Sequence, residues 1–239
     1  MNIAIITARG GSKSIPDKNV MDVGGKPLVS YPIEAAQQAS LVGAVFVSTD
    51  CPKIRDVADA CGVDGICPRP RELCGDDVNH GDVIQHAVRS IAGMIGGVDN
   101  VVVLLGNTVM VDGELIDEAL AILDAEPRTT GAMSVWQAGD DHPCRAMHID
   151  EHGGLFSRTY GQSTNRQSYQ PTYYYDQGVW AFRAECVERR DGPSPWWWMG
   201  SRCKPIVRPW VTGRDIHGAL DVDISEWWLS RQREVAHAH

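Results

Sequence analysis

Short runs of branched apolar residues alternate along the chain with longer stretches of helical spacing. The runs predict buried parallel strands, because both faces of each run are apolar. These strands are expected at residues 3–7, 44–48, 100–105 and 130–136. The stretches between them predict helices, which are expected at residues 27–40, 52–61, 78–95 and 114–123. Strands that alternate with helices indicate an α/β fold with a mostly parallel sheet and right-handed crossovers.

The ends of three predicted strands should meet in space. Ligands of such sheets bind beyond the carboxyl ends of the strands. We therefore expect the loops after Thr7, Ser48 and Leu105 to line one site.

The pattern changes at about residues 142–175, within what we expect to be one domain of residues 1–239. This stretch is rich in Gly, Tyr, Gln, Ser and Arg and has no helical period, which predicts a β-rich insertion. It is either an ordinary surface excursion or an arm that packs on a second subunit. The tryptophans at 196–198 and 227–228 similarly fit either core packing or a dimer interface.

Composition narrows the class of protein. The formal net charge of -9 argues against a nucleic-acid partner but is compatible with a nucleotide ligand. The 7 cysteines are scattered and form no C-x-x-C pair, as expected of reduced thiols. There is no basic leader and no apolar run of about 20 residues, so we expect a soluble, cytoplasmic protein without a membrane partner.

The segment directly after the first strand carries the strongest chemical signal. Two adjacent glycines let backbone amides approach an anion, and three cations lie within ten residues. A triphosphate needs this combination of donors and local charge. Neither the P-loop spacing nor the dinucleotide fingerprint is present. The expected nucleotide-binding residues of this loop are Ala8, Arg9, Gly10, Gly11, Ser12, Lys13, Lys18 and Asn19.

This loop resembles the opening of the acylneuraminate (CMP-sialic acid) cytidylyltransferase family, whose members begin with a strand followed by Ala-Arg-Gly-Gly-Ser-Lys. The likeness continues in order over nearly the whole chain, through residues 24–28, 47–50, 69–73, 83–87, 166–167, 178 and 221–223. The resemblance implies a Rossmann-like nucleotidyltransferase fold with CTP as donor and Mg²⁺ as cofactor. It also implies a homodimer whose insertion arm reaches the partner's site.

Two carboxylates near the end of the chain predict the metal site. In an extended segment positions i and i+2 face the same side, so Asp221 and Asp223 would converge. Hard oxygen ligands suit Mg²⁺, which would bridge the triphosphate and neutralise its developing charge.

The acceptor half of the resemblance is altered. Where the family has Leu-Gln-Pro-Thr-Ser-Pro, this chain has Leu-Gly-Asn-Thr-Val-Met from position 105, and Gln177 replaces an asparagine. Three arginines of the insertion could clamp a compact dianion or form surface ion pairs. The expected acceptor residues are Asn107, Thr108, Arg145, Arg158, Arg166, Gln167 and Gln177.

These features predict a CTP-dependent cytidylyltransferase. An acceptor oxygen would attack the α-phosphorus of CTP in line, and pyrophosphate would leave. The catalytic cations would be Arg9, Lys13 and Lys18. Arg69 would donate to the nucleotide, and Asp50 would serve the ribose or the structure.

Several functions remain open. The altered acceptor residues favour a small phosphonate such as phosphonoformate, and a nonulosonic (sialic-acid-like) acid is the alternative. An inactive nucleotide-binding module is disfavoured by the carboxylate pair. A uridylyl- or guanylyltransferase is disfavoured by the absence of a longer Gly-x-Gly-Thr-Arg-Leu-type loop.

Overall fold

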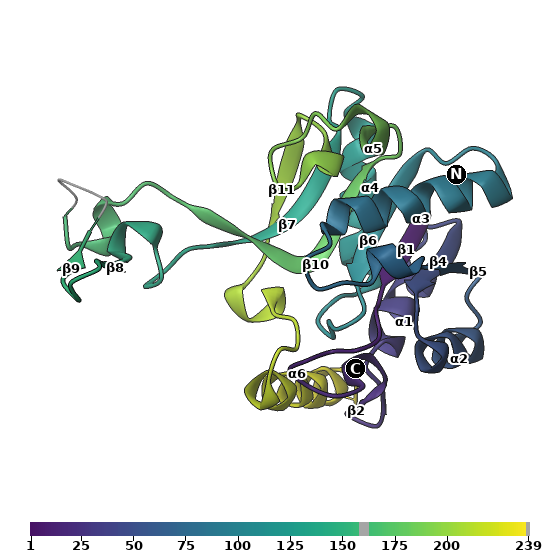
Figure 1. The fold of residues 1–239 in the computed structure, drawn as a ribbon, viewed down its shortest axis with the longest axis horizontal. Coiled ribbons are helices and arrows are strands. Elements are labelled where there is room, and N and C mark those ends of the chain that lie inside the picture. Colours follow the sequence, from purple (N-terminus) through teal and green to yellow (C-terminus); the bar gives the residue numbers. More distant parts are fainter. Residues whose placement is uncertain (158–162, 238–239) are drawn as a thin grey trace.

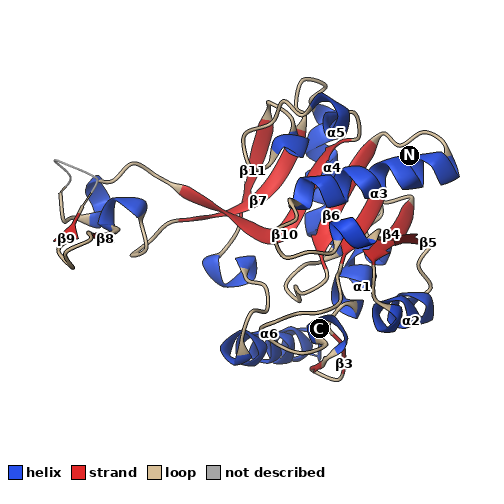
Figure 2. Cartoon of the chain, viewed as in Figure 1, coloured by secondary structure: helices blue, strands red, loops and turns tan. Residues whose placement is uncertain are grey.

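Seven strands form one mixed sheet, which is the frame of the molecule (Figures 1 and 2). The computed structural model describes residues 1–157 and 163–237. β10 runs antiparallel to β6 and β7, whereas the other neighbouring strands are parallel. The predicted α/β fold with a mostly parallel sheet is therefore confirmed. In sheet order the strands are β11 (Cys203–Val207), β7 (Gly131–Gln137), β10 (Tyr173–Arg183), β6 (Asn100–Leu105), β1 (Ile3–Thr7), β4 (Ala44–Thr49) and β5 (Gly65–Pro68).

Helices cover both faces of the sheet (Figure 2). Side chains alternate along β1, so Ala4 and Ile6 join one buried cluster and Ile3 and Ile5 join the other. The first cluster packs against α1 (Ser30–Gln38), α2 (Pro52–Cys61) and α4 (Gly113–Ala125). The second packs against α3 (His80–Ile95) and α5 (Cys186–Arg189). The 3-10 turn Trp197–Met199 closes the second cluster, where Trp198 is buried.

The prediction of a helix from residue 27 is wrong at its start. Lys26–Pro27 instead form β3, which pairs with β2 (Asp22–Val23) in a small hairpin. The two turn residues, Gly24 and Gly25, have φ values of 62° and 101°, which only glycine adopts without strain. α1 therefore begins after the hairpin, at Ser30.

The carboxylate pair near the end of the chain does not lie in an extended segment. Residues 221–223 lie near the start of α6 (Ala219–His237), and the predicted extended conformation is wrong. Val222 and Leu229 pack on a third small cluster with Val23 of the hairpin and Ile216. The packing of α6 on the hairpin favours a helix here, whereas the Asp-x-Asp pattern predicted an extended segment. No helix within the described ranges is long and apolar enough to span a membrane.

The insertion leaves the sheet between β7 and β10 and projects away from it (Figure 1). Its residues include the short antiparallel pair β8 (His148–Ile149) and β9 (Leu155–Phe156). The side chains of this pair and of a neighbour expose large apolar surface, namely at Met147, Ile149, Leu155 and Phe156. We call residues 138–172 the arm.

Candidate active site

Three loops meet at the carboxyl ends of β1, β4 and β6. The amide of Ala8 donates to the carbonyl of Ser48 at 3.1 Å, and the amide of Gly106 donates to the carbonyl of Thr7 at 3.0 Å. These bonds join the three strand ends that the sequence predicts to share a site. The cleft at this edge is lined by Thr7, Arg9, Ser12, Lys18, Asn19 and Asn107.

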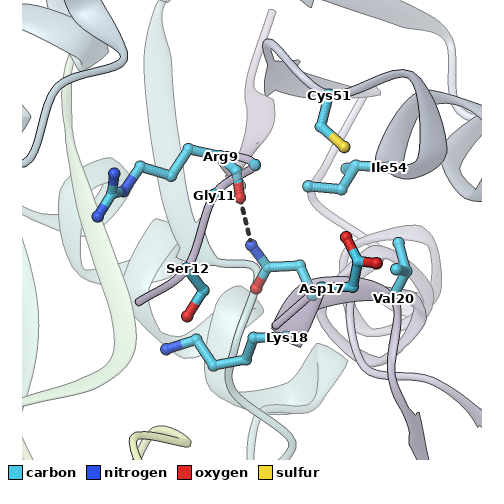
Figure 3. Close-up of a pocket in the computed structure, with 10 residues that line it drawn as sticks. Arg9, Gly11, Ser12, Asp17, Lys18, Val20, Cys51 and Ile54 are labelled. Carbon is cyan, nitrogen blue, oxygen red and sulfur yellow. Dashed lines mark hydrogen bonds between the residues drawn. The ribbon is translucent and has the colours of Figure 1, made fainter. Parts of the chain in front are cut away.

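Two polar side chains fix the shape of the donor loop, which we define as residues 8–19. The amide of Gly10 donates to Asp50 Oδ1 at 2.8 Å. The buried Asn19 donates from Nδ2 to the carbonyl of Arg9 at 3.0 Å, shown as the dashed line in Figure 3. Gly11, with a φ of 65°, completes the turn between them. In this structure Asp50 therefore shapes the loop, one of the two roles expected for it.

The donor loop brings its cations to one side of the loop. In Figure 3 the charged ends of Arg9 and Lys18 point the same way, away from Cys51 and Ile54. Lys18 donates to the carbonyl of Ile216 at 2.7 Å. Burial lowers the pKa of Lys18. Arg9 and Lys13 both pair with Asp76, which lies on the loop between β5 and α3.

A second cleft of about 190 Å³ adjoins the donor loop. Arg69 lines this cleft, and its Nη2 donates to the carbonyl of Ser48 at 3.1 Å. Burial lowers the pKa of Arg69. Arg69 and Arg9 line the same cleft, and a contact between Arg69 and the nucleotide stays a prediction. The cleft is lined by Thr7, Arg9, Arg69, Leu73, Gly75, Asp76, Val78, His80, Val83 and Leu105.

His80 is a neutral polar group in this cleft. Its Nε2 lies 3.0 Å from Thr7 Oγ1, and its ring makes T-shaped contacts with the rings of Trp180 and Trp198. Burial, aided by the charge of Arg69, lowers the pKa of His80 to about 4. Sequence reasoning missed His80, Thr7 and Asp76 as site residues. The position of Thr7 at the end of the first strand was the one signal that pointed to any of them.

A strap, which we define as residues 208–218 between β11 and α6, closes the site from the other side. Asn107 Nδ2 donates to Asp215 Oδ2 at 2.7 Å, and the amide of Ile216 donates to the carbonyl of Asn107 at 2.9 Å. Arg208 anchors the start of the strap in a buried ion pair with Asp176 of β10, at 3.5 Å. The strap thus links β10, β6 and the donor loop.

Asp221 is held by the strap. Its Oδ1 accepts from Arg214 at 2.6 Å, and its Oδ2 accepts from the amides of His217 and Gly218, both at 2.9 Å. Burial alone would raise the pKa of Asp221, but these hydrogen bonds outweigh it and lower the pKa.

The two predicted metal ligands do not fit one ion as they lie here. Both oxygens of Asp221 already accept hydrogen bonds, whereas Asp223 is exposed. Residues i and i+2 of a helix are roughly 200° apart around its axis, so the two carboxylates diverge. Among the described residues no group of three or more His, Cys, Asp or Glu side chains could hold a metal. The Mg²⁺ site stays a prediction from the sequence.

The predicted acceptor residues are divided between two regions. Asn107 and the buried Thr108 follow β6 at the donor cleft, and the half-buried Gln177 lies in β10. Arg145 pairs with Asp140 at 2.9 Å in the arm, which also holds Gln167. The arm projects away from the sheet, so these two regions lie apart within one chain (Figure 1).

The described part of the chain does not include the side chains of the other two predicted acceptor residues. Arg158 lies outside the described residues, and of Arg166 the structure describes the backbone alone.

Gly106, which stands where the family has glutamine, lies close to the donor loop. A Cβ atom on Gly106 would lie 2.6 Å from Cβ of Ala8. The end of β6 therefore approaches the donor loop too closely for any side chain at this position.

A mostly parallel sheet with a glycine- and cation-rich loop after its first strand defines a nucleotide-binding α/β enzyme of the nucleotidyltransferase class. The chain belongs to the cytidylyltransferase family, because the family model described as Cytidylyltransferase matches residues 3–189. The prediction of a CTP-dependent cytidylyltransferase is thereby confirmed.

Individual relatives and solved structures agree with the family. The chain is 27% identical over 183 residues to the pseudaminic acid cytidylyltransferase of Campylobacter jejuni, covering 76% of this chain and 77% of the relative. It is 41% identical over 86 residues to the N-acylneuraminate cytidylyltransferase of Escherichia coli, covering 36% and 20%. A solved structure of CMP:2-keto-3-deoxy-manno-octonic acid synthetase complexed with CTP shares the fold, with a TM-score of 0.70, 16% identity and coverage of 97% and 99%.

Proposed function

We propose that the protein transfers CMP from CTP to a nonulosonic acid and releases pyrophosphate. The observation that carries the donor half is the loop after β1, which presents Arg9, Lys13 and Lys18 at the carboxyl edge of the sheet. The acceptor half is supported by relatives that are named for pseudaminic, N-acylneuraminic and legionaminic acids, whereas another relative is named for 3-deoxy-manno-octulosonate.

In this proposal two neighbouring clefts of the donor site bind different parts of CTP. The glycine turn of the donor loop and the three loop cations would bind the triphosphate. The adjoining cleft, lined by Arg69 and the neutral His80, would take the nucleoside end. In this arrangement the cations stabilise the charge that develops on the leaving pyrophosphate, and the protein contributes positioning rather than covalent chemistry.

The reaction would form a bond between an acceptor oxygen and the α-phosphorus as the bond to the β-phosphate oxygen breaks. A nonulosonic acid offers a hydroxyl, which gives up its proton during this step. The phosphonate acceptor favoured by the altered motif finds no support among the relatives, and the nonulosonic alternative fits them better. Gly106, which stands where the family has glutamine, packs against Ala8 of the donor loop, so the altered motif also affects the donor side of the site.

Two further features of the proposal concern cofactor and assembly. We expect Mg²⁺ dependence from the resemblance, but we assign no step to the ion because Asp221 and Asp223 do not fit it as placed. We also expect a homodimer, since the arm carries Arg145 and Gln167 away from the chain's own donor cleft (Figure 1).

The test is pyrophosphate release with CTP and Mg²⁺, comparing pseudaminic acid, N-acetylneuraminic acid and phosphonoformate as acceptors. We expect release with at least one sugar acid and none with the phosphonate. Release with phosphonoformate alone would refute the proposed acceptor class. UTP in place of CTP serves as the donor control, and its turnover should be at least about tenfold slower, a difference of about 1.4 kcal/mol in the barrier.

A further inference from the structure

One carboxylate in the donor site holds two of the three loop cations. Asp76 contacts the guanidinium of Arg9 through Oδ1 and the ammonium of Lys13 through Oδ2. Arg9 also donates to the carbonyl of Cys74 at 3.3 Å. Loop residues 74–76 therefore occupy the groups that the triphosphate requires.

The phosphates and Asp76 compete for the same donors. Charge-assisted bonds from Arg and Lys are the strongest contacts that a phosphate makes with protein. A carboxylate left among them would repel the phosphate oxygens, because both groups are negatively charged. Binding of CTP through Arg9 and Lys13 must therefore release Asp76 from both.

Phosphates can replace Asp76 at Arg9 and Lys13 with little loss of stability, because both ion pairs face solvent. The side chains of Arg9, Asp76 and Lys13 are 36%, 35% and 82% exposed. Exposed pairs of this kind contribute little to stability. Hydrogen bonds from Lys13 and Arg9 lower the pKa of Asp76, so the carboxylate is charged at neutral pH and can return to them.

We propose that Asp76 is a positioning residue that competes with phosphates for Arg9 and Lys13. It keeps both cations on the site side of the donor loop while the site is free, and it yields them to the triphosphate. After CMP transfer it competes for them again and speeds the departure of pyrophosphate. The inference rests on the donor half of the proposed function and does not depend on the acceptor.

The experiment compares Asp76→Asn with Asp77→Asn, which removes the same charge from the exposed neighbouring residue. Calorimetry would measure the binding of CTP, pyrophosphate and cytidine to each variant and to the unaltered protein. We expect Asp76→Asn to bind CTP and pyrophosphate roughly three- to tenfold more tightly than the other two proteins. Cytidine should bind all three proteins equally, because it carries no phosphate.

Turnover provides a readout that a merely structural role would not give. With a competent acceptor, Asp76→Asn should lower both the KM for CTP and kcat, because pyrophosphate leaves more slowly. Unchanged or weaker binding of pyrophosphate by Asp76→Asn would overturn the inference, as would equal tightening in Asp77→Asn. The binding measurements use no acceptor, so they decide the inference even if the nonulosonic acid is not a substrate.

Discussion

At the scale of single residues, the site depends on polar groups that are kept in one protonation state. His80 lies at the start of α3 against two tryptophan rings, and burial keeps its ring neutral. A neutral ring can hydrogen-bond Thr7 without adding positive charge beside Arg69. The aromatic residues at 196–198, which fit either of two roles from the sequence, here pack in or against the buried cluster next to His80.

This environment predicts a pH-dependent stability. Below pH 6.5 the unfolded chain takes up a proton on His80 that the folded chain excludes until about pH 4. The stabilising contribution is therefore complete above pH 6.5 and is lost as the pH falls toward 4. The free energy of unfolding of the unaltered protein should fall between pH 7 and pH 5. In His80→Gln this fall should be smaller by about 2 kcal/mol, as measured by urea unfolding at the two pH values. Identical pH dependence in the two proteins would contradict the assignment.

At the scale of elements, the sequence was informative where local pattern and packing agree. The starts of β1, β4, α2 and β6 follow from apolar runs and from proline and glycine positions. Pro27 was misleading because the two preceding glycines form a hairpin turn, which delays the helix to Ser30. Asp76 could not be predicted, because its contacts to the donor loop join segments more than sixty residues apart.

The strap and the start of α6 give Asp221 and Asp223 different roles. Asp221→Asn should lower the free energy of unfolding by about 1–2 kcal/mol, because it weakens the charge-assisted bonds from Arg214 and two amides. Asp223→Asn should unfold like the unaltered protein, because Asp223 is exposed. Denaturant titration of both variants measures the difference.

Asp223→Asn then becomes a clean test of the predicted Mg²⁺ site. Since we expect its stability to be unchanged, a loss of activity at saturating Mg²⁺ would support a ligand role for Asp223. Full activity, with the same Mg²⁺ dependence as the unaltered protein, would show that this carboxylate is not required for the metal.

At the scale of the whole molecule, the arm is the part that lies away from the central sheet. β8 and β9 project from the sheet with Ile149 and Leu155 72% and 68% exposed (Figure 1). Such side chains are stabilised when a second surface covers them. The sequence indicated an insertion here from its lack of helical period, but it could not show that the arm diverges from its own donor cleft. That divergence favours a second copy of the chain as the surface that the arm covers.

Covering both side chains in a dimer would contribute about 1.5–3 kcal/mol for each. Replacing both, as Ile149→Asp with Leu155→Asp, should therefore weaken self-association at least about 100-fold, measured by analytical ultracentrifugation. Met94→Asp on α3 is the matched control, because Met94 is 57% exposed on the body of the molecule and should leave association unchanged. If Arg145 and Gln167 complete the partner's acceptor site, the double variant should also lose sugar-acid transfer while it still binds CTP. A protein that is monomeric before substitution, yet fully active, would show instead that the arm serves neither assembly nor the acceptor.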